Sequence, residues 1–244
     1  MHAVRRYVPS VATVVVVALC VVAGNWQRAR MHYKESLRAQ YDSAAAAAPL
    51  DARALPIVSG DWAALRYRQV ALQGTFERQH QFFLDNKVQA GLVGYDVIAP
   101  LRLDDGRVVL VDRGWVAQGP TRAELPAVAT PAGPLLVRGR IEQPAAAYFE
   151  LQKEQSPRPV WQHLDLSRFS AFSGIAVLPV IVQQTVPVSP EDRLTRSWPA
   201  PDFGIDTHRI YMVQWYTFAV IALTFWGVAH WPRRTQPRQD DRNE

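Results

Sequence analysis

Two long apolar runs constrain this chain more than any other feature of its sequence. The first, residues 8–24, contains four consecutive valines and no charged residue, and the second, residues 208–231, holds 24 residues. At about 1.5 Å per residue, the second run is roughly 36 Å long, which is enough to span a bilayer. The first run has 17 residues, at the lower limit for a span. We therefore expect two transmembrane helices with a folded segment, residues 25–207, between them.

A cleaved signal peptide is an alternative interpretation of the first run, since that run is short and lies near the start of the chain. The residues before Asn25 read Val-Val-Ala-Gly, which would make a mediocre cleavage site. A helical pattern also continues beyond this point, through Trp26, Arg30, Tyr33 and Leu37. An uncleaved anchor is therefore our prediction, and the signal peptide stays the alternative.

The net charge of +5 comes mostly from the two ends of the chain. Residues 26–207 hold 20 Lys and Arg against 19 Asp and Glu, which leaves only +1 in the middle segment. Basic residues beside membrane spans form no continuous groove for phosphates. Nucleic-acid binding is therefore disfavoured.

Basic residues also predict the orientation of the chain in the membrane. Arg5 and Arg6 precede the first run, and an arginine pair at positions 233–234 follows the second. By the positive-inside bias, residues 1–7 and 232–244 are expected to be cytoplasmic and the middle segment exported. Four basic residues soon after the first run oppose this orientation, but the bias weakens for long translocated segments.

The middle segment has the pattern of a β domain. Residues 67–76 alternate between apolar and polar side chains, and residues 95–103 and 107–116 flank an Asp-Asp-Gly turn, as in a β-hairpin. Further elements are expected as strands at residues 82–86, 135–142, 159–164 and 178–185 and as a short helix at residues 167–173, capped by Asp165 or Ser167. We therefore predict a mainly antiparallel β domain, a small barrel or a sandwich with a short helix, between the two transmembrane helices.

The sequence lacks the motifs of common hydrolases and of thiol-based metal sites. It contains no nucleophile elbow of the form G-x-S-x-G, and its six histidines never occur at His-x-x-x-His spacing. Cys20 is the only cysteine, so neither a disulfide within the chain nor a two-thiol copper or zinc site can form. We therefore predict that the chain is not an enzyme.

A histidine at the start of the second apolar run is the best clue to function. His208, Tyr211, Met212 and Trp215 follow the i, i+3, i+4, i+7 spacing, so a helix would present them on one face. An ionisable residue beside a lipid-facing run is a functional candidate, and neutral imidazole is a common axial ligand of heme iron. A solvated histidine at the level of the headgroups is the alternative, and the interfacial aromatic belt would explain Trp215.

A second candidate lies in the β domain, where Asp112-Arg113-Gly114-Trp115 ends a predicted strand. In a structural interpretation, a carboxylate holds Arg113, the glycine permits a bend and the tryptophan covers the core. In a functional interpretation, the guanidinium binds a propionate or the carboxylate of a partner, because arginine forms bidentate hydrogen bonds with such groups. The sequence leaves both interpretations open.

Four stretches carry the motifs of one known family. They are Gly24–Arg30 with Lys34 and Leu37, similar to W-Q-x-x-R-x-x-x-K; Gly91–Tyr95 followed by Ala99-Pro100-Leu101; Val109–Val116, similar to V-L-V-N-R-G-W-V; and His208–Tyr216, similar to H-L-x-Y-A-x-Q-W-F. Together they resemble the surfeit-locus family of cytochrome oxidase assembly proteins, in order and spacing over residues 24–226. Asp112 departs from the family's Asn, and residues 205–207 stand where the family has Asn-Asn, which puts a role for amides beside His208 in doubt.

The resemblance implies a biogenesis factor for cytochrome c oxidase that binds heme A and supports its delivery into oxidase subunit I. By position, His208 would be the iron ligand and Trp215 a porphyrin-packing surface, with Tyr211 and Arg113 as further cofactor-binding residues. Heme A synthase is a further expected partner. Because no Arg/Ser-rich leader precedes the first run, we expect a bacterial inner membrane with a periplasmic middle domain rather than a mitochondrion. The alternative is a cofactor-free scaffold that stabilises oxidase assembly intermediates.

Overall fold

The computed structural model describes residues 2–56, 61–121, 124–144 and 159–231. The chain divides into two compact units, one formed by residues 1–39 and 201–244 and the other by residues 40–200. The first unit is helical, and the second is mainly β-structure. Residues 232–244, for which the sequence predicts a cytoplasmic tail, lie outside the described part of the chain.

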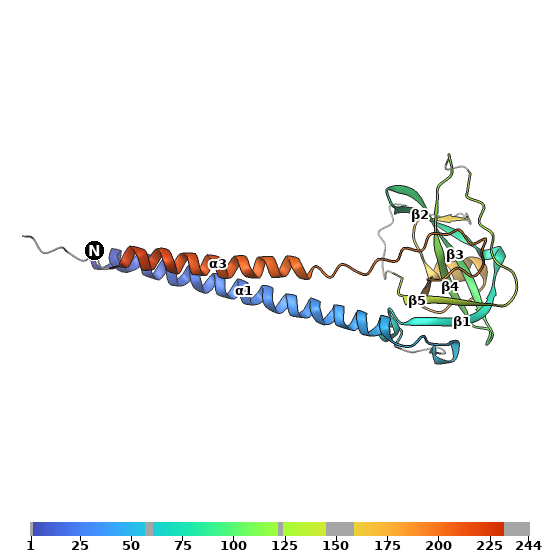
Figure 1. The fold of residues 1–244 in the computed structure, drawn as a ribbon, viewed down its shortest axis with the longest axis horizontal. Helices are drawn as coiled ribbons and strands as arrows, with labels where there is room; N and C mark the ends of the chain where they lie inside the picture. Colours follow the sequence, from blue (N-terminus) through green and yellow to red (C-terminus); the bar gives the residue numbers. More distant parts are fainter. Residues whose placement is uncertain (1, 57–60, 122–123, 145–158, 232–244) are drawn as a thin grey trace, which may run out of the picture. The chain divides into compact units, whose positions relative to one another are not determined.

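The helical unit consists of two antiparallel helices that run side by side (Figure 1). They are α1, His2–Ala46, whose last turns belong to the β unit, and α3, Ile205–His230. Both are long and apolar enough to cross a membrane. Only 11% of the most apolar stretch of α1 and 6% of that of α3 are buried in the protein. Large apolar side chains such as Val14, Leu19 and Phe225 are exposed. Because exposed apolar surface of this extent is typical of helices that face lipid, the structure favours association with a membrane.

Helix α1 continues far beyond the apolar run. Its 45 residues correspond to roughly 67 Å of helix, and the predicted helical continuation through Leu37 is confirmed. The helix ends shortly before Pro49, which cannot donate to a helical hydrogen bond. Near this end, the Tyr41 hydroxyl accepts a hydrogen bond of 2.8 Å from Arg140 Nη1, and the Tyr41 ring packs edge-on against Tyr67 at 4.8 Å. These contacts hold the last turns of α1 to the β unit.

The β unit contains short strands joined by turns and short helices. The strands are β1 Gln69–Phe76, β2 Phe82–Gln89, β3 Leu92–Leu103, β4 Val108–Ala117, β5 Leu135–Glu142, β6 Val160–Trp161 and β7 Ile181–Gln184. The helices are α2, Leu166–Ser173, and the 3-10 turns η1 Ala52–Ala54, η2 Ala63–Leu65 and η3 Arg78–His80. Strand β5 has the bounds that the sequence predicts, whereas β6 and β7 are shorter than predicted.

In the described part of the chain, five strands close into a barrel. The hydrogen-bonded order is β1-β5-β7-β4-β3-β2-β6, and an additional β1–β3 pairing closes the ring. Strands β2 and β6 extend from β3 outside this ring. Five pairings are antiparallel, and two, β4–β7 and β2–β6, are parallel. The prediction of a mainly antiparallel β domain with a short helix is confirmed, and the β1–β3 closure makes it a barrel rather than a sandwich.

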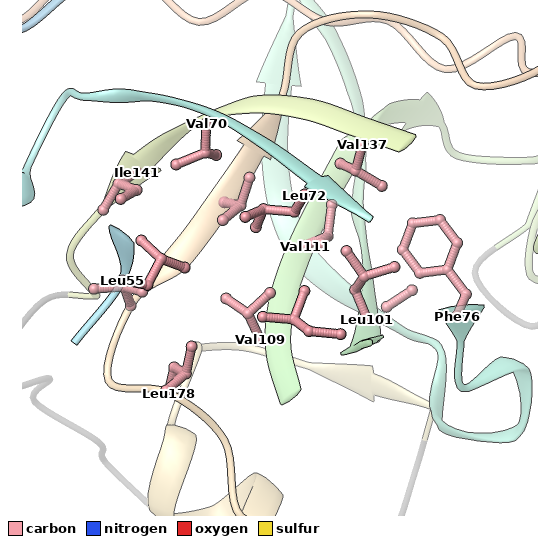
Figure 2. Packing of buried hydrophobic residues seen from close by; sticks show 14 of the residues in the cluster. Leu55, Val70, Leu72, Phe76, Leu101, Val109, Val111, Val137, Ile141 and Leu178 are labelled. Atoms are coloured by element: carbon pink, nitrogen blue, oxygen red, sulfur yellow. The ribbon is translucent and has the colours of Figure 1, made fainter. Parts of the chain in front are cut away.

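Apolar side chains fill the barrel (Figure 2). Val70 and Leu72 of β1, Leu101 of β3 and Val109 of β4 are at most 1% exposed, and they pack in one cluster with Ile141 of β5. The interior of a small barrel is just wide enough to be filled by such side chains. The barrel is therefore a packed core that gives rigid support to the residues on its strands.

Two local predictions come from turn and cap chemistry, and both are confirmed. Gly106 closes the β3–β4 hairpin with a φ of 85°, a conformation that glycine adopts without strain. Asp165 caps α2, because its carboxylate accepts a hydrogen bond of 3.0 Å from the Arg168 backbone N–H. Phe169 of α2 then packs on Phe82, which buries one face of this helix against β2.

Candidate functional site

The two long helices meet along a line of half-buried and buried positions that we call the helix seam. On both helices these positions recur at intervals of three and four residues, the spacing of a coiled coil. The helix seam comprises Ser10, Thr13, Val17, Cys20, Gly24, Gln27, Met31 and Lys34 on α1 and Ile205, His208, Met212, Trp215, Ala219 and Ala222 on α3. The seam thus includes His208 and Trp215, two of the residues singled out in the sequence.

Among the described residues, three side-chain hydrogen bonds join the helices across the seam. Gln27 Oε1 lies 2.7 Å from His208 Nδ1, the Tyr216 hydroxyl donates to Asn25 Oδ1 at 2.8 Å, and Trp226 Nε1 donates to Ser10 Oγ at 3.1 Å. Hydrogen bonds between membrane helices contribute about 0.6 kcal/mol each on average. Each of the three bonds therefore adds only a little to the stability of the helix pair.

A glycine allows close approach of the helices near the first two of these bonds. A Cβ atom at Gly24 would lie 2.6 Å from Cε1 of the Tyr216 ring, a distance that real Cβ atoms do not show. The absence of a side chain at Gly24 thus makes room for Tyr216, whose hydroxyl bonds to the neighbouring Asn25. The close approach at Gly24 places the next turn of α1, with Gln27, opposite His208.

The contact with Gln27 determines the tautomer and the orientation of the His208 ring. An amide oxygen only accepts hydrogen bonds, so in a neutral imidazole the proton must reside on Nδ1. Nε2 then carries the lone pair, and within the described residues it has no hydrogen-bond partner. His208 is half-buried and lies near the start of α3. Because Gln27 holds Nδ1, the ring offers the lone pair of Nε2 in one fixed direction.

The four residues predicted to share one face of the helix do not all lie on the seam. Met212 and Trp215 follow His208 at i+4 and i+7 and are half-buried. Tyr211 is 47% exposed and lies beside the seam. Helix α3 is rotated so that positions with coiled-coil spacing contact α1. Tyr211, three residues after His208, therefore lies at the edge of the seam.

Arg113 belongs to the β unit and is almost completely buried, with 1% of its surface exposed. Its Nη1 donates to Gln81 Oε1 at 2.7 Å and to the backbone oxygen of Ala129 at 3.0 Å, and its guanidinium lies over the Phe76 ring at 5.5 Å. Thr130 adds a hydroxyl bond to the same Gln81 oxygen at 2.7 Å. The sequence-based structural interpretation expected a carboxylate partner, but the direct acceptors are an amide and a backbone carbonyl. Arg113 of β4 thus binds the segments that precede β2 and β5.

A cavity of about 420 Å³ borders Arg113. Its lining includes Glu191, Asp192 and Arg193, so acidic and basic groups are balanced around it. Asp192 also forms a buried ion pair with Arg196. Burial lowers the pKa of the Arg113 guanidinium, whereas nearby Asp192 raises it. This balanced charge favours a structural role for Arg113 over capture of an external carboxylate.

Two buried carboxyl groups, Asp96 of β3 and Asp112 of β4, lie close to each other in the β unit. Burial raises the pKa of Asp112 well above the ordinary 3.8, and the neighbouring charge of Asp96 raises it further. Asp112 Oδ1 accepts a hydrogen bond of 3.2 Å from the Gly114 backbone N–H. Asp96 forms an ion pair with Lys87 Nζ at 2.8 Å. The sequence drew attention to Asp112 as part of the Asp112–Trp115 motif and as a departure from the family's Asn, but nothing in the local pattern indicated its acidic neighbour.

Gln27, the contact that positions His208, was not singled out as a site residue in the sequence. It lies within the first of the four motifs, and His208, which begins the fourth, is 181 positions further along the chain. The only signal was their shared membership of one motif set. The hydrogen bond shows that these two motifs meet in space.

Comparison with known proteins gives one consistent result. The sequence profile described as the SURF1 family matches residues 14–220, which include both long helices in large part and the whole β unit. A SURF1-like protein of Monosiga brevicollis is 26% identical over 214 residues, covering 83% of this chain and 80% of that protein. Surfeit locus protein 1 of Takifugu rubripes is 24% identical over 223 residues, covering 83% and 89% respectively. Cytochrome oxidase assembly protein SHY1 of Saccharomyces cerevisiae is 32% identical over 98 residues, which is 39% of this chain and 24% of that protein.

Proposed function

Because the chain belongs to the SURF1 family, we propose that it takes part in the assembly of cytochrome oxidase, that it binds heme A through His208 and that it supports delivery of this heme into oxidase subunit I. One relative is itself described as a cytochrome oxidase assembly protein, and this supports the general role. The chain acts in this proposal as an assembly factor and not as an enzyme. Heme A is its cargo.

The observation that carries the heme proposal is the hydrogen bond between Gln27 and His208. Histidine ligands of metals nearly always give their second ring N–H to an acceptor that fixes the tautomer and the ring orientation. His208 has this arrangement, because Gln27 Oε1 lies 2.7 Å from Nδ1 and Nε2 is without a partner in the described part of the chain. The residues present therefore fit a site in which His208 would hold heme iron through Nε2.

The neighbouring aromatic residues have separate roles in this proposal. Trp215 lies two helical turns from His208 on the helix seam, where its indole packs edge-on against Phe218 at 6.0 Å. A flat apolar side chain in this position is suited to stack on a porphyrin. Tyr211 is exposed beside the seam, so it contributes to the proposed site from the flank.

The proposed setting is a bacterial inner membrane, with both termini cytoplasmic and the β unit in the periplasm. The exposed apolar side chains of α1 and α3 support contact with the lipid bilayer. The β unit would then dock oxidase subunit I or heme A synthase. In this orientation His208 lies at the periplasmic end of α3, where a heme could be passed on without crossing the bilayer again.

The experiment compares the wild type with His208→Ala after purification from cells that make heme A. We expect the wild type to carry heme A, seen in its visible spectrum, and the variant to lose most of it. His230→Ala is the matched control, because His230 lies on the same helix but stacks on Trp226 at 4.8 Å and is exposed. This control should keep its heme.

Two outcomes would contradict the heme proposal. In one, none of the three preparations carries heme, and the cofactor-free scaffold takes its place. In the other, wild type and His208→Ala carry heme equally, and the iron ligand lies elsewhere. Circular dichroism at the helical band, unchanged in both variants, ensures that heme loss does not reflect loss of the helices.

A further inference from the structure

We infer that Gln27 is a positioning residue for His208, one that holds the imidazole in the tautomer and orientation needed for Nε2 to bind iron. This inference rests on the proposed function, since it concerns the same site. It adds a residue of α1 to the site residues that the sequence placed on α3 and at Arg113. The site would then depend on both membrane helices.

The geometry of the helix seam makes Gln27 a fixed acceptor. Gln27 occupies a seam position and is half-buried, and its Oε1 lies 2.7 Å from His208 Nδ1. One turn earlier, Gly24 accommodates the Tyr216 ring and Asn25 accepts the hydrogen bond of its hydroxyl. The close packing of the Tyr216 ring at Gly24 sets the register of α1 against α3. The amide of Gln27 therefore faces His208 as a consequence of how the helices pack.

The charged groups near His208 are engaged with one another. Arg209 Nη1 binds Asp206 Oδ1 at 3.0 Å, and Arg209 Nη2 lies 4.0 Å from Glu35 Oε1. Glu35 also binds His32 Nδ1 at 3.0 Å. Gln27 is thus the partner of the His208 ring in the described part of the chain.

The hydrogen bond has two chemical consequences for an iron ligand. A neutral histidine without an acceptor divides between two tautomers, and the apparent affinity falls with the fraction that is competent to bind. An acceptor that binds the Nδ1 proton also polarises this N–H bond, and Nε2 becomes a more basic ligand. Loss of such an outer contact typically reduces metal affinity by roughly 10–100-fold.

The test uses two substitutions at Gln27 in the full-length protein purified from cells that make heme A. Gln27→Leu keeps the approximate volume and removes the acceptor, whereas Gln27→Glu has no amide nitrogen and offers only acceptor oxygens. Heme retention is measured as the rate of transfer to excess apomyoglobin, and the reduction potential of the bound heme by redox titration. The matched control is Asn25→Leu, which removes the bond to Tyr216 and leaves His208 untouched.

We expect Gln27→Leu to release heme at least roughly tenfold faster than the wild type. Gln27→Glu should retain heme and shift its reduction potential downward, because a carboxylate pulls harder on the Nδ1 proton and a more basic ligand favours the oxidised iron. A merely structural role for Gln27 would not change the potential in this direction. Asn25→Leu should match the wild type in both measurements.

The outcomes separate this inference from the function on which it rests. If His208→Ala keeps its heme, both the ligand assignment and the role of Gln27 are wrong. If His208→Ala loses heme but Gln27→Leu retains it as the wild type does, only the role of Gln27 is wrong. If Asn25→Leu releases heme as fast as Gln27→Leu, helix pairing and not ring positioning is responsible, and the inference also fails.

Discussion

Replacing Arg113 with alanine is expected to lower the free energy of unfolding of the β unit by about 3–4 kcal/mol. Truncating a large buried side chain costs about 2–5 kcal/mol, and the carbonyl of Ala129 left without its donor costs about 1–3 kcal/mol more. Relief of a charge that burial disfavours offsets part of this loss. The measurement is thermal or urea unfolding of the full-length protein, followed by the β-sheet band of its infrared spectrum.

Two further substitutions at Arg113 separate the parts of this effect. Arg113→Met keeps most of the volume over the Phe76 ring but makes no hydrogen bond, so we expect a loss of only about 1–2 kcal/mol. Arg113→Lys keeps the charge but loses the planar fork, so it should also melt below the wild type. If Arg113→Ala unfolds like the wild type, the contacts to Gln81 and Ala129 do not hold the fold.

Arg113→Lys also tests the proposal that this arginine binds a heme propionate. If the bonds to Gln81 and Ala129 are its main role, the variant loses stability and keeps the wild-type heme content. If Arg113 binds a propionate, the variant melts like the wild type and loses heme. The 1% exposure of the side chain leads us to expect the first result.

The sequence predicted the elements of the β unit better than their arrangement. Strand β5 and the β3–β4 hairpin are marked by local signals, which are alternation of apolar residues and a glycine at the turn. The parallel pairing of β4 with β7 brings Val111 beside Val182. No local pattern contains that information, because the partner of a strand depends on the closure of the whole sheet. For the same reason the sequence predicted a mainly antiparallel domain without deciding between barrel and sandwich.

The candidate site was predicted in part, and the missing part is again long-range. Local helical spacing identified His208, Met212 and Trp215 but also included Tyr211, because spacing alone does not determine how far the helix is turned toward its neighbour. The contact of His208 with Gln27 depends on the register of two helices that are far apart in sequence. The acceptors of Arg113 likewise come from other segments, which is why a carboxylate partner was expected and an amide was found.

Asp112→Asn is expected to stabilise the β unit at neutral pH, by roughly 1–3 kcal/mol, the range for relieving one unfavourably buried polar group. The two side chains have nearly the same shape, and asparagine keeps an oxygen that can accept the hydrogen bond from the Gly114 N–H. Its amide removes the like charge that Asp112 and Asp96 impose on each other. The substitution also restores the residue of the motif V-L-V-N-R-G-W-V that residues 109–116 resemble.

The pH dependence gives this prediction a definite sign. Because burial and Asp96 raise the pKa of Asp112 in the folded protein, the folded state binds more protons than the unfolded chain above pH 3.8. The unfolding free energy of the wild type therefore falls as pH rises from that value until the carboxyl ionises in the folded state. Asparagine does not titrate, so the advantage of Asp112→Asn should be small near pH 4 and grow toward pH 7.

The opposite behaviour is expected of Asp105→Asn, which serves as the matched control. Asp105 binds Arg107, and the hydrogen bonds from Arg107 lower the pKa of this carboxyl. Its stabilising contribution is therefore present at neutral pH and is lost as pH falls, so Asp105→Asn should be slightly less stable than the wild type at pH 7. Urea unfolding of the two variants between pH 4 and pH 7 would thus give differences of opposite sign. If Asp112→Asn follows the wild type at every pH, a charge on Asp112 does not disfavour the fold, and Lys87 must offset the effects of burial and of Asp96.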